Sequence, residues 1–259
     1  MDRDLPAALA RLYDLDLAVE PGDLDLYLAL AGRTNQPIIE LAVGTGRLAL
    51  PLASAGHEVT GVDIDAAMLA RARERTEAAG PDVAARLRLV EGDLFAPRPD
   101  EAGRYGLAIL ALNSILLLGG SGDQRRAIGA LAELLAPGGI AVVDAWQPLP
   151  DDLVSFDGRL SLEWSRRDPA TGRDVIKLAA AWYDGAARSV TLTTIFDEAG
   201  PGEAPVRWTR VDALHLISAD ELRAHAADAG LIVEVVAGDY DLTPLMAGDD
   251  RAILVARRP

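Results

Sequence analysis

Short apolar runs alternate with longer amphipathic ones over the first two thirds of the chain. The apolar runs predict buried strands at residues 37–43, 57–63, 86–91, 105–112 and 140–145. The amphipathic stretches predict helices at residues 46–55, 66–79 and 123–136, the last ending at Pro137-Gly138-Gly139. Continuous apolar strands joined by helices indicate a doubly wound α/β domain, in which helices cover both faces of a parallel sheet.

After Trp146 the pattern changes to one typical of antiparallel strands separated by turn clusters, at residues 159–165, 174–183, 189–196 and 207–216. A capping box at Ser218-Ala219-Asp220-Glu221 then starts a helix that runs to Ala229, and strands follow at 231–237 and 252–257. We therefore predict one α/β domain at residues 1–147 and 218–259, interrupted by a β-rich insert at residues 148–217.

Large aromatic side chains concentrate in this insert or at its entrance, where all four tryptophans lie. One interpretation is that a small antiparallel layer needs large side chains to make a core. The other is that some of them line a ligand pocket. On the second interpretation the candidate pocket residues are Trp146, Trp182, Tyr183 and Arg210.

The composition narrows the classes of function. The chain of 259 residues carries a net charge of −15 and a single lysine, so its surface repels phosphate backbones and we expect no nucleic acid partner. It has no cysteine, which excludes disulfides and thiolate chemistry. No apolar run approaches the roughly 20 residues of a membrane helix, and no signal peptide is evident. We expect a cytoplasmic protein that does not bind a membrane.

Gly44-Thr45-Gly46-Arg47-Leu48-Ala49 matches the glycine fingerprint G-x-G-x-x-G/A of dinucleotide-binding turns, and Asp63 follows at the spacing of a ribose contact. By itself this turn suits NAD or another adenosine-bearing cofactor. Glu40 precedes the turn, and a carboxylate there opposes a pyrophosphate but suits a cationic amine. Asp93 and the pair Asn113-Ser114 end the third and fourth predicted strands, at the edge where ligands bind.

With these features the sequence resembles the class I S-adenosylmethionine (SAM)-dependent methyltransferases. The segments that carry the resemblance are ELAVGTGR, GVDIDAAMLARAR, EGDL, LNSILLL and LLAPGGIAVVDAW, in that order. The resemblance covers about residues 10–147 and 218–259. It implies a Rossmann-like, mostly parallel seven-stranded sheet with a terminal antiparallel hairpin, plus an antiparallel β-rich cap insert that forms part of the substrate pocket. The implied cofactor is SAM, with S-adenosylhomocysteine as product and no metal.

The resemblance also implies roles for individual residues. Gly44 and Gly46 would cradle the methionine part of SAM, Glu40 would organise its ammonium group, and Asp63 would bind the ribose. Ala42 replaces the family's first glycine, and we expect its methyl group to be tolerated. The complete predicted cofactor set is Tyr13, Glu40, Ala42, Gly44, Gly46, Asp63, Ile64, Met68, Asp93, Leu94, Asn113 and Ser114. Met68 and Leu94 are open to a second interpretation as ordinary core residues, and Asp63 as a helix N-terminal acid.

Methyl transfer is an in-line displacement in which the protein mainly supplies position and excludes water. A base is needed only when the acceptor is a hydroxyl that must lose a proton early. The candidate catalytic residues are His215, as a base, and Tyr13, which would close over the methyl donor. A structural histidine and a mechanism with no dedicated base remain open alternatives.

We expect the acceptor to be an N or O nucleophile of a small organic molecule. The absence of cysteine closes the covalent route to C5 of cytosine, and Asn113-Ser114-Ile115-Leu116 differs from the N/D-P-P-Y sequence used on exocyclic base amines. The alternatives are a tRNA or protein methyltransferase, a module that binds SAM only structurally, and an NAD(P)-dependent oxidoreductase. The sequence leaves the oligomeric state open between monomer and homodimer.

Overall fold

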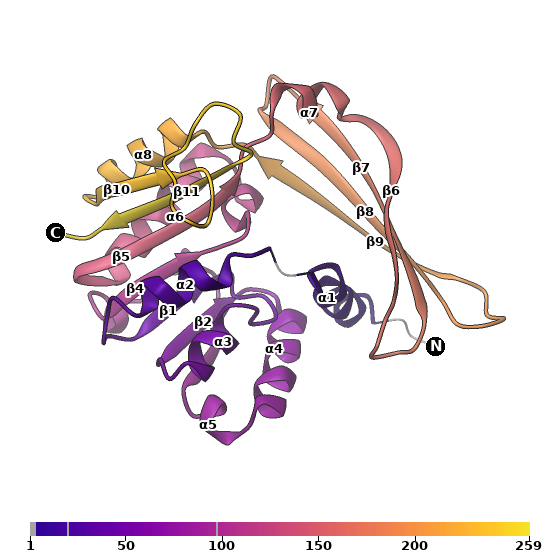
Figure 1. Cartoon of the computed structure of the whole chain (residues 1–259), viewed down its shortest axis with the longest axis horizontal. Coiled ribbons are helices and arrows are strands. Elements are labelled where there is room, and N and C mark those ends of the chain that lie inside the picture. Colours follow the sequence, from indigo (N-terminus) through magenta and orange to yellow (C-terminus); the bar gives the residue numbers. More distant parts are fainter. Residues whose placement is uncertain (1–3, 20, 97) are drawn as a thin grey trace. The chain divides into compact units, whose positions relative to one another are not determined.

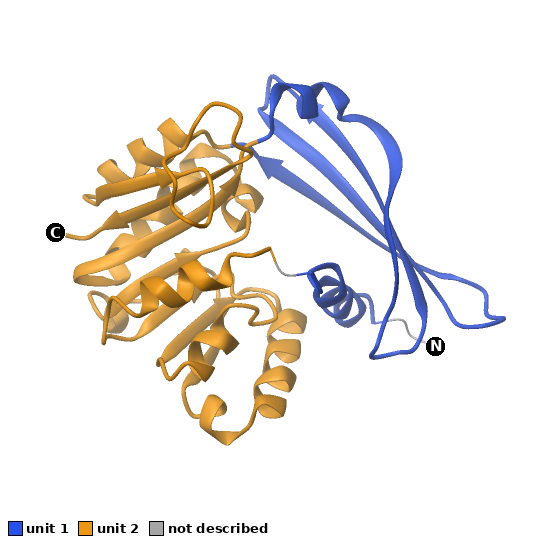
Figure 2. Cartoon of the chain, in the orientation of Figure 1, with its two compact units in different colours: residues 1–19, 148–216 blue, residues 20–147, 217–259 orange. Residues whose placement is uncertain are grey.

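The structure is a computed structural model that describes residues 4–19, 21–96 and 98–259. The chain divides into two compact units (Figure 2). The first, called here the β unit, comprises residues 1–19 and 148–216, and the second, called here the α/β unit, comprises residues 20–147 and 217–259. The insert was predicted at residues 148–217, and residues 1–19 were assigned to the α/β domain. In the structure residues 4–19 belong instead with the β-rich segment.

The α/β unit is built on a seven-stranded sheet with the strand order β10-β11-β5-β4-β1-β2-β3 (Figure 1). Strands β1 to β5 run parallel, whereas β11 lies antiparallel between β5 and β10. This confirms the mostly parallel sheet with a terminal antiparallel hairpin. The strands are β1 (Ile38–Leu41), β2 (Val59–Asp63), β3 (Leu87–Glu91), β4 (Tyr105–Leu110), β5 (Leu135–Trp146), β10 (Ile232–Ala237) and β11 (Arg251–Arg257).

Helices cover both faces of this sheet. Every residue of β1 and β4 is buried, as expected for central strands with side chains packed on both sides. Helices α3 and α4 contact β2 and β3. Helix α6 contacts β4 and β5, α8 contacts β10 and β11, and the two helices contact each other. The helices are α2 (Leu24–Ala31), α3 (Ala49–Ser54), α4 (Ala66–Ala79), α5 (Pro81–Ala84), α6 (Ser121–Leu134) and α8 (Ala219–Asp228), with 3-10 turns η1 (Pro99–Glu101) and η2 (Ser114–Leu117).

The predicted boundary between α6 and β5 was wrong. We predicted that the helix ends at Ala136 and the strand starts at Ile140, but α6 ends at Leu134 and β5 starts at Leu135. The residue before a proline is disfavoured in the helical region, so Ala136 is extended. Leu135 and Ala136 are also buried, which favours adding them to the sheet opposite Tyr105.

The β unit contains a four-stranded antiparallel meander, as predicted for the insert. Its strands follow one another in the order β6 (Asp157–Arg167), β7 (Asp174–Asp184), β8 (Ser189–Ala199) and β9 (Val206–His215). Two helices complete it, α1 (Leu5–Asp16) and the short α7 (Pro150–Ser155). Strands β6, β7 and β8 are longer than predicted, because they continue past the apolar positions that mark a strand in sequence, whereas β9 is shifted by one residue from the predicted 207–216.

Helix α1 joins the β unit through an apolar stripe and several polar contacts. Leu12 and Leu15 are buried in one cluster with Phe196 of the sheet, and Trp164 packs against it. Asp16 then accepts hydrogen bonds from Trp164 Nε1 at 2.8 Å and from the Nζ of Lys177, the only lysine, at 2.7 Å. These contacts favour the core interpretation for Trp164 and explain why residues 4–19 group with the sheet.

Candidate functional site

The glycine turn after β1 is closed by the acid that ends β2. Asp63 Oδ2 accepts a hydrogen bond from the Gly44 backbone nitrogen at 2.7 Å, and its Oδ1 accepts one from Asp65 N at 2.9 Å. Gly46 has φ of +77°, and a Cβ there would lie 2.6 Å from Leu50 Cδ1. The left-handed backbone therefore favours glycine at position 46, and a Cβ there would also displace the end of the Leu50 side chain. The structure brings the predicted residues Gly44, Gly46 and Asp63 together.

Ala42 departs from the sequence expectation in its backbone. We expected only its methyl volume to matter, but Ala42 has φ of +55°, in the left-handed region. An L-residue there costs about 1–2 kcal/mol relative to the right-handed conformation. The cost of replacing the family's first glycine is therefore conformational rather than a matter of space.

Glu40 is the buried acid at the carboxyl end of β1. Glu40 is only 4% exposed, and its side-chain Oε2 has no hydrogen-bond partner among the described residues. Burial raises the pKa of this carboxyl to about 8, against the opposing effects of the nearby Arg47 guanidinium and a hydrogen bond from the Ala49 backbone. A buried acceptor without a donor is costly, and a cationic N–H donor would remove that cost.

Arg47, inside the glycine turn, is bound to a buried carboxylate that sequence reasoning missed. Its Nη1 and Nη2 donate to the two oxygens of Asp23, each at 2.6 Å. Asp23 is wholly buried and precedes α2. No local pattern connects these two residues, because they lie 24 positions apart on different elements. The turn is supported further by Arg75 of α4, which donates to Thr45 O at 3.1 Å.

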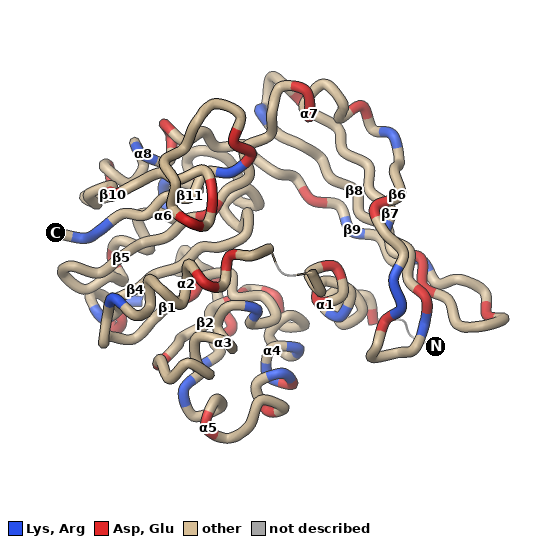
Figure 3. Tube along the Cα trace, in the orientation of Figure 1, with Lys and Arg blue, Asp and Glu red and all other residues tan. Residues whose placement is uncertain are grey.

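Arginine and glutamate residues gather along α4 (Figure 3), a pattern typical of a solvated helix face. Arg73 is exposed and Arg71 pairs with Glu74 at 3.1 Å on the helix surface. Arg75 differs, since its guanidinium binds the glycine turn. The helix therefore carries two solvated arginines and one that holds the site.

The residues after β3 and β4 are fixed by contacts of their own. Asp93 Oδ1 accepts from Phe95 N at 2.8 Å, and Arg98 donates to Asp93 O at 3.1 Å. Asn113 Oδ1 accepts from Trp146 N at 2.6 Å, which ties the end of β4 to the end of β5. Asn113 and Leu112 both have positive φ, at 66° and 46°. Such strain persists only where surrounding contacts hold it, and it clusters at functional sites.

A second buried acid lies at the same edge of the sheet. Asp144 of β5 is wholly buried, pairs with Arg251 of β11 at 2.5 Å, and accepts from the Tyr240 hydroxyl at 3.1 Å. Burial raises the pKa of Asp144, although Arg251 opposes the shift. No sequence motif links Asp144 to Arg251 on β11 or to Tyr240 in the loop before that strand.

The predicted residues Ile64 and Met68 differ in burial. Ile64 is 73% exposed immediately after β2, whereas Met68 is 9% exposed on the inner face of α4. An apolar side chain as exposed as Ile64 is available to a ligand face. Met68 has the burial of a core residue, so both of its interpretations stay open. Ser114, the other predicted residue at this edge, starts η2 after Asn113.

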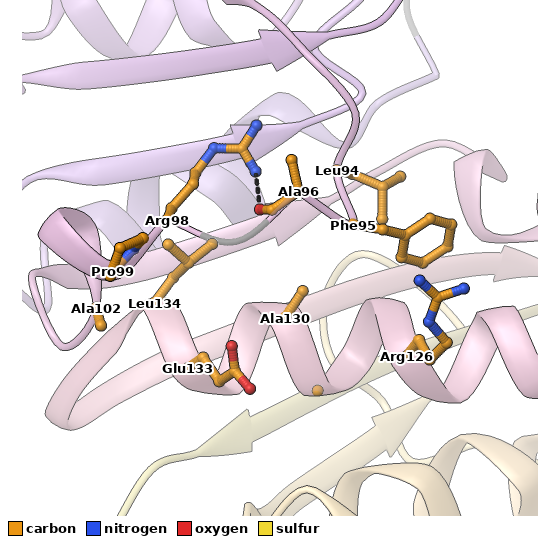
Figure 4. A pocket seen from close by; sticks show the side chains of 11 residues that line it. Leu94, Phe95, Ala96, Arg98, Pro99, Ala102, Arg126, Ala130, Glu133 and Leu134 are labelled. Atoms are coloured by element: carbon orange, nitrogen blue, oxygen red, sulfur yellow. Dashed lines mark hydrogen bonds between the residues drawn. The ribbon is translucent and has the colours of Figure 1, made fainter.

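A pocket of about 510 Å³ opens beside α6, on the side of the loop that follows β3 (Figure 4). Leu94, one of the predicted cofactor residues, lines it together with Phe95 and Arg126, whose guanidinium lies 4.2 Å from the Phe95 ring centre. In the described part of the β3–β4 connection the only regular element is η1. Arg98, Pro99 and Ala102 of this connection also line the pocket.

The remaining predicted residues belong mainly to the β unit. Tyr13 is half-buried on α1, and Trp182 is 53% exposed on β7 beside the half-buried Tyr183. Arg210 on β9 pairs with Asp212 at 2.8 Å, and the half-buried His215 ends β9. Trp146 is the exception, since it ends β5 in the α/β unit. The roles given to these residues stay predictions.

The arrangement in the α/β unit is suited to a cation. The Glu40 carboxyl lies within the electrostatic influence of Asp23 and Asp63 as well as of Arg47. Because its Oε2 has no partner among the described residues, a cationic N–H donor is the group that would satisfy it. Within the described ranges no three His, Asp or Glu side chains gather as a metal-binding group. Nor is any helix of those ranges long and apolar enough to cross a bilayer.

Comparisons with known proteins point to one kind of chemistry. Residues 38–139 match a family described as "Methyltransferase domain". The chain is 27% identical to the dTDP-3-amino-3,4,6-trideoxy-alpha-D-glucopyranose N,N-dimethyltransferase of Streptomyces venezuelae, over 88% of this chain and 92% of that protein. It is 40% identical to the demethylmenaquinone methyltransferase of Thermus thermophilus, over 53% of this chain and 58% of that protein. The solved structure of the CcbJ methyltransferase from Streptomyces caelestis is similar with a TM-score of 0.79 and 26% identity, covering 93% of this chain and 98% of that one.

Proposed function

Because the chain is a class I SAM-dependent methyltransferase, we propose that it methylates an amino group of a small, sugar-like molecule. The NAD(P)-dependent oxidoreductase considered from the glycine turn alone is thereby set aside. The observation that carries the proposal is the buried, unpartnered Glu40 oxygen beside the glycine turn. It is the place where a cationic amine on the cofactor would be held.

The chain's own residues fit SAM at this turn. Glu40 would accept a hydrogen bond from the ammonium group, which satisfies its open oxygen. Asp63 already accepts two backbone hydrogen bonds, but an ionised carboxylate has about four acceptor positions, so two remain for ribose hydroxyls. Bound SAM supplies an activated methyl group on a positively charged sulfur. The backbone from Gly44 to Gly46 would lie against the methionine part.

The amine acceptor is supported by the relative that spans nearly the whole chain. The sugar N,N-dimethyltransferase matches 88% of this chain, whereas the demethylmenaquinone methyltransferase matches 53%. A match over 88% of this chain must include most of the segment that builds the β unit. A neutral amine can attack directly, so this acceptor needs no dedicated base, and His215 remains a candidate base only for a hydroxyl.

The test is a methylation assay with SAM and matched acceptor pairs. Each amino sugar is paired with the sugar that carries a hydroxyl at the same carbon, both free and linked to a nucleoside diphosphate. We expect the amino compounds to gain one or two methyl groups by mass spectrometry while the hydroxyl compounds gain none. Methylation of the hydroxyl partner alone would overturn the amine assignment, and no SAM turnover with either would count against the sugar-like acceptor.

The remaining assignments are part of the same proposal and need separate tests. We propose that Trp146, Trp182, Tyr183 and Arg210 contribute to acceptor binding and that Tyr13 closes over the methyl donor. Substituting each should raise the acceptor KM more than it weakens cofactor binding. We also propose a cytoplasmic enzyme without a nucleic acid partner, for which bulk tRNA should show no salt-sensitive retardation in a gel. Sedimentation would decide between monomer and homodimer.

A further inference from the structure

Asp23 occupies a position where an aspartate usually has a different task. It is the residue before the first turn of α2, where an aspartate side chain normally accepts a hydrogen bond from the helix backbone. Asp23 makes no such bond, and both of its oxygens instead bind the Arg47 guanidinium at 2.6 Å. The wholly buried Asp23 carboxylate therefore binds Arg47 of the glycine turn instead of capping α2.

Arg47 has a second buried carboxylate within its influence. Among the charged groups near Glu40, Arg47 is the strongest that stabilises the ionised form, so its guanidinium lies close to that side chain. Yet Glu40 Oε2 has no hydrogen-bond partner in the part of the chain that the structure describes. Two buried acids thus compete for one guanidinium, and Asp23 holds it with the two-pronged geometry that arginine and carboxylate prefer.

We propose that Asp23 is a positioning residue that holds Arg47 away from Glu40, so that the Glu40 oxygen stays open for the ammonium group of the cofactor. This inference rests on the proposed function, in which Glu40 binds that ammonium group. Without the charge of Asp23, Arg47 loses its two-pronged ion pair, and Glu40 is a second buried carboxyl whose ionised form the guanidinium already stabilises. The arginine would then occupy the position that the cofactor amine needs.

The proposal separates two parts of the cofactor. S-adenosylhomocysteine carries the amine, whereas methylthioadenosine has the same adenosine and sulfur without the amino acid group. In Asp23→Asn we expect the affinity for S-adenosylhomocysteine to fall by about 10- to 100-fold, the worth of a hydrogen bond to a charged group. The affinity for methylthioadenosine should change by less than about 2-fold, since it makes no contact with Glu40. Isothermal titration of the full chain measures both.

Two further variants make the test specific. In the double variant Asp23→Asn with Arg47→Gln the competing cation is gone, and we expect the affinity for S-adenosylhomocysteine to recover to within about 3-fold of the original. Asp25→Asn is the matched control, because Asp25 lies two positions later on the exposed face of α2. It should leave both affinities unchanged.

The outcomes distinguish this inference from the proposed function. If Glu40→Gln lowers only the S-adenosylhomocysteine affinity but Asp23→Asn leaves it unchanged, the proposed function stands and the positioning role fails. If the double variant does not recover, Arg47 is not the blocking group and the positioning role fails as well. If Asp23→Asn weakens both ligands equally, its role is in folding. If Glu40→Gln has no effect on either ligand, the proposed function itself fails at this site.

Discussion

Two buried acids at one edge of the α/β sheet have opposite surroundings. Glu40 and Asp144 are 4% and 0% exposed, and burial raises the pKa of both carboxyls. Asp144 is enclosed by Arg251 at 2.5 Å and the Tyr240 hydroxyl at 3.1 Å. Glu40 keeps one oxygen without a partner among the described residues, although an arginine lies near it.

This difference in partners distinguishes an acid that stabilises the fold from one that is available to a ligand. A buried charge with all its partners in the chain is satisfied whether or not a ligand is bound. A buried charge left open costs stability until its partner arrives, and that stored cost becomes binding free energy for the correct cation. We therefore interpret Asp144 as an anchor between β5 and β11 and Glu40 as a binding residue.

The largest effect on the free energy of unfolding should follow from replacing Asp144, the enclosed acid. Asp144→Asn leaves Arg251 as an uncompensated, largely buried charge, and removing one partner of a buried pair costs about 3–5 kcal/mol of unfolding free energy. Urea unfolding monitored by circular dichroism measures it. The control is Glu234→Gln, which breaks the surface pairs with Arg33 at 3.0 Å and Arg257 at 3.4 Å and should cost about 1 kcal/mol or less. Equal losses in the two variants would contradict the contrast.

The next effect should be on binding rather than on folding. Glu40→Gln removes the acidic group that would ionise against the cofactor amine, so the affinity for SAM should fall by about 1.5–3 kcal/mol. The unfolding free energy of the ligand-free protein should stay the same or rise near neutral pH, since a neutral amide is less costly to bury than a carboxylate. Titration calorimetry and urea unfolding of the same sample check both. A variant that loses stability without losing affinity would show that Glu40 is structural.

The pH dependence of stability sharpens the comparison further. The Glu40 pKa is raised from 4.5 to about 8 in the folded protein, so the folded state keeps a proton that the unfolded state loses. Stability is then fully present below pH 4.5 and is lost as pH rises toward 8, by at most about 1.4 kcal/mol per pH unit for one proton. The pKa of Asp144 is raised as well, so the quantity to measure is the difference between the original protein and Glu40→Gln. A difference that does not change with pH contradicts an open, buried Glu40.

The smallest effect concerns the turn that follows Glu40. Ala42→Gly removes the left-handed strain at φ of +55° but adds chain entropy to the unfolded state, for a net gain of up to about 1 kcal/mol. The control is Ala108→Gly in β4, which is buried and extended and should lose about 1 kcal/mol or more. Thermal unfolding resolves changes of this size. Loss of stability in Ala42→Gly would mean that its methyl group makes contacts worth more than the strain.

The sequence predicted most of the fold because the evidence for each element is local. Helix α4 has the predicted bounds, residues 66–79, since a capping aspartate precedes it and Gly80-Pro81 ends it. The start of β5 was missed because the burial of Leu135 and Ala136 depends on a distant strand. The placement of residues 4–19 was missed for a similar reason, since Leu12 and Leu15 could not be matched to Phe196 from sequence.

The candidate site was predictable to the same extent. Glu40, Gly44, Gly46 and Asp63 lie within one strand–turn–helix–strand segment, whose spacing brings them together. Asp23, by contrast, lies outside every motif, and a single acid before an amphipathic helix is most simply interpreted as a helix cap. Its bond to Arg47 depends on how α2 packs beside the glycine turn, which no local pattern encodes.

The insertion of β11 between β5 and β10 has a consequence for biosynthesis. The ion-pair partner of Asp144, Arg251, is synthesised 107 residues later. Until β11 has emerged from the ribosome, β5 presents an unpaired edge rich in apolar residues. Such edges readily pair with strands of other chains. Chaperone dependence during synthesis should therefore be governed by the arrival of the final hairpin, and a nascent chain stalled just before it would be the species most prone to aggregate.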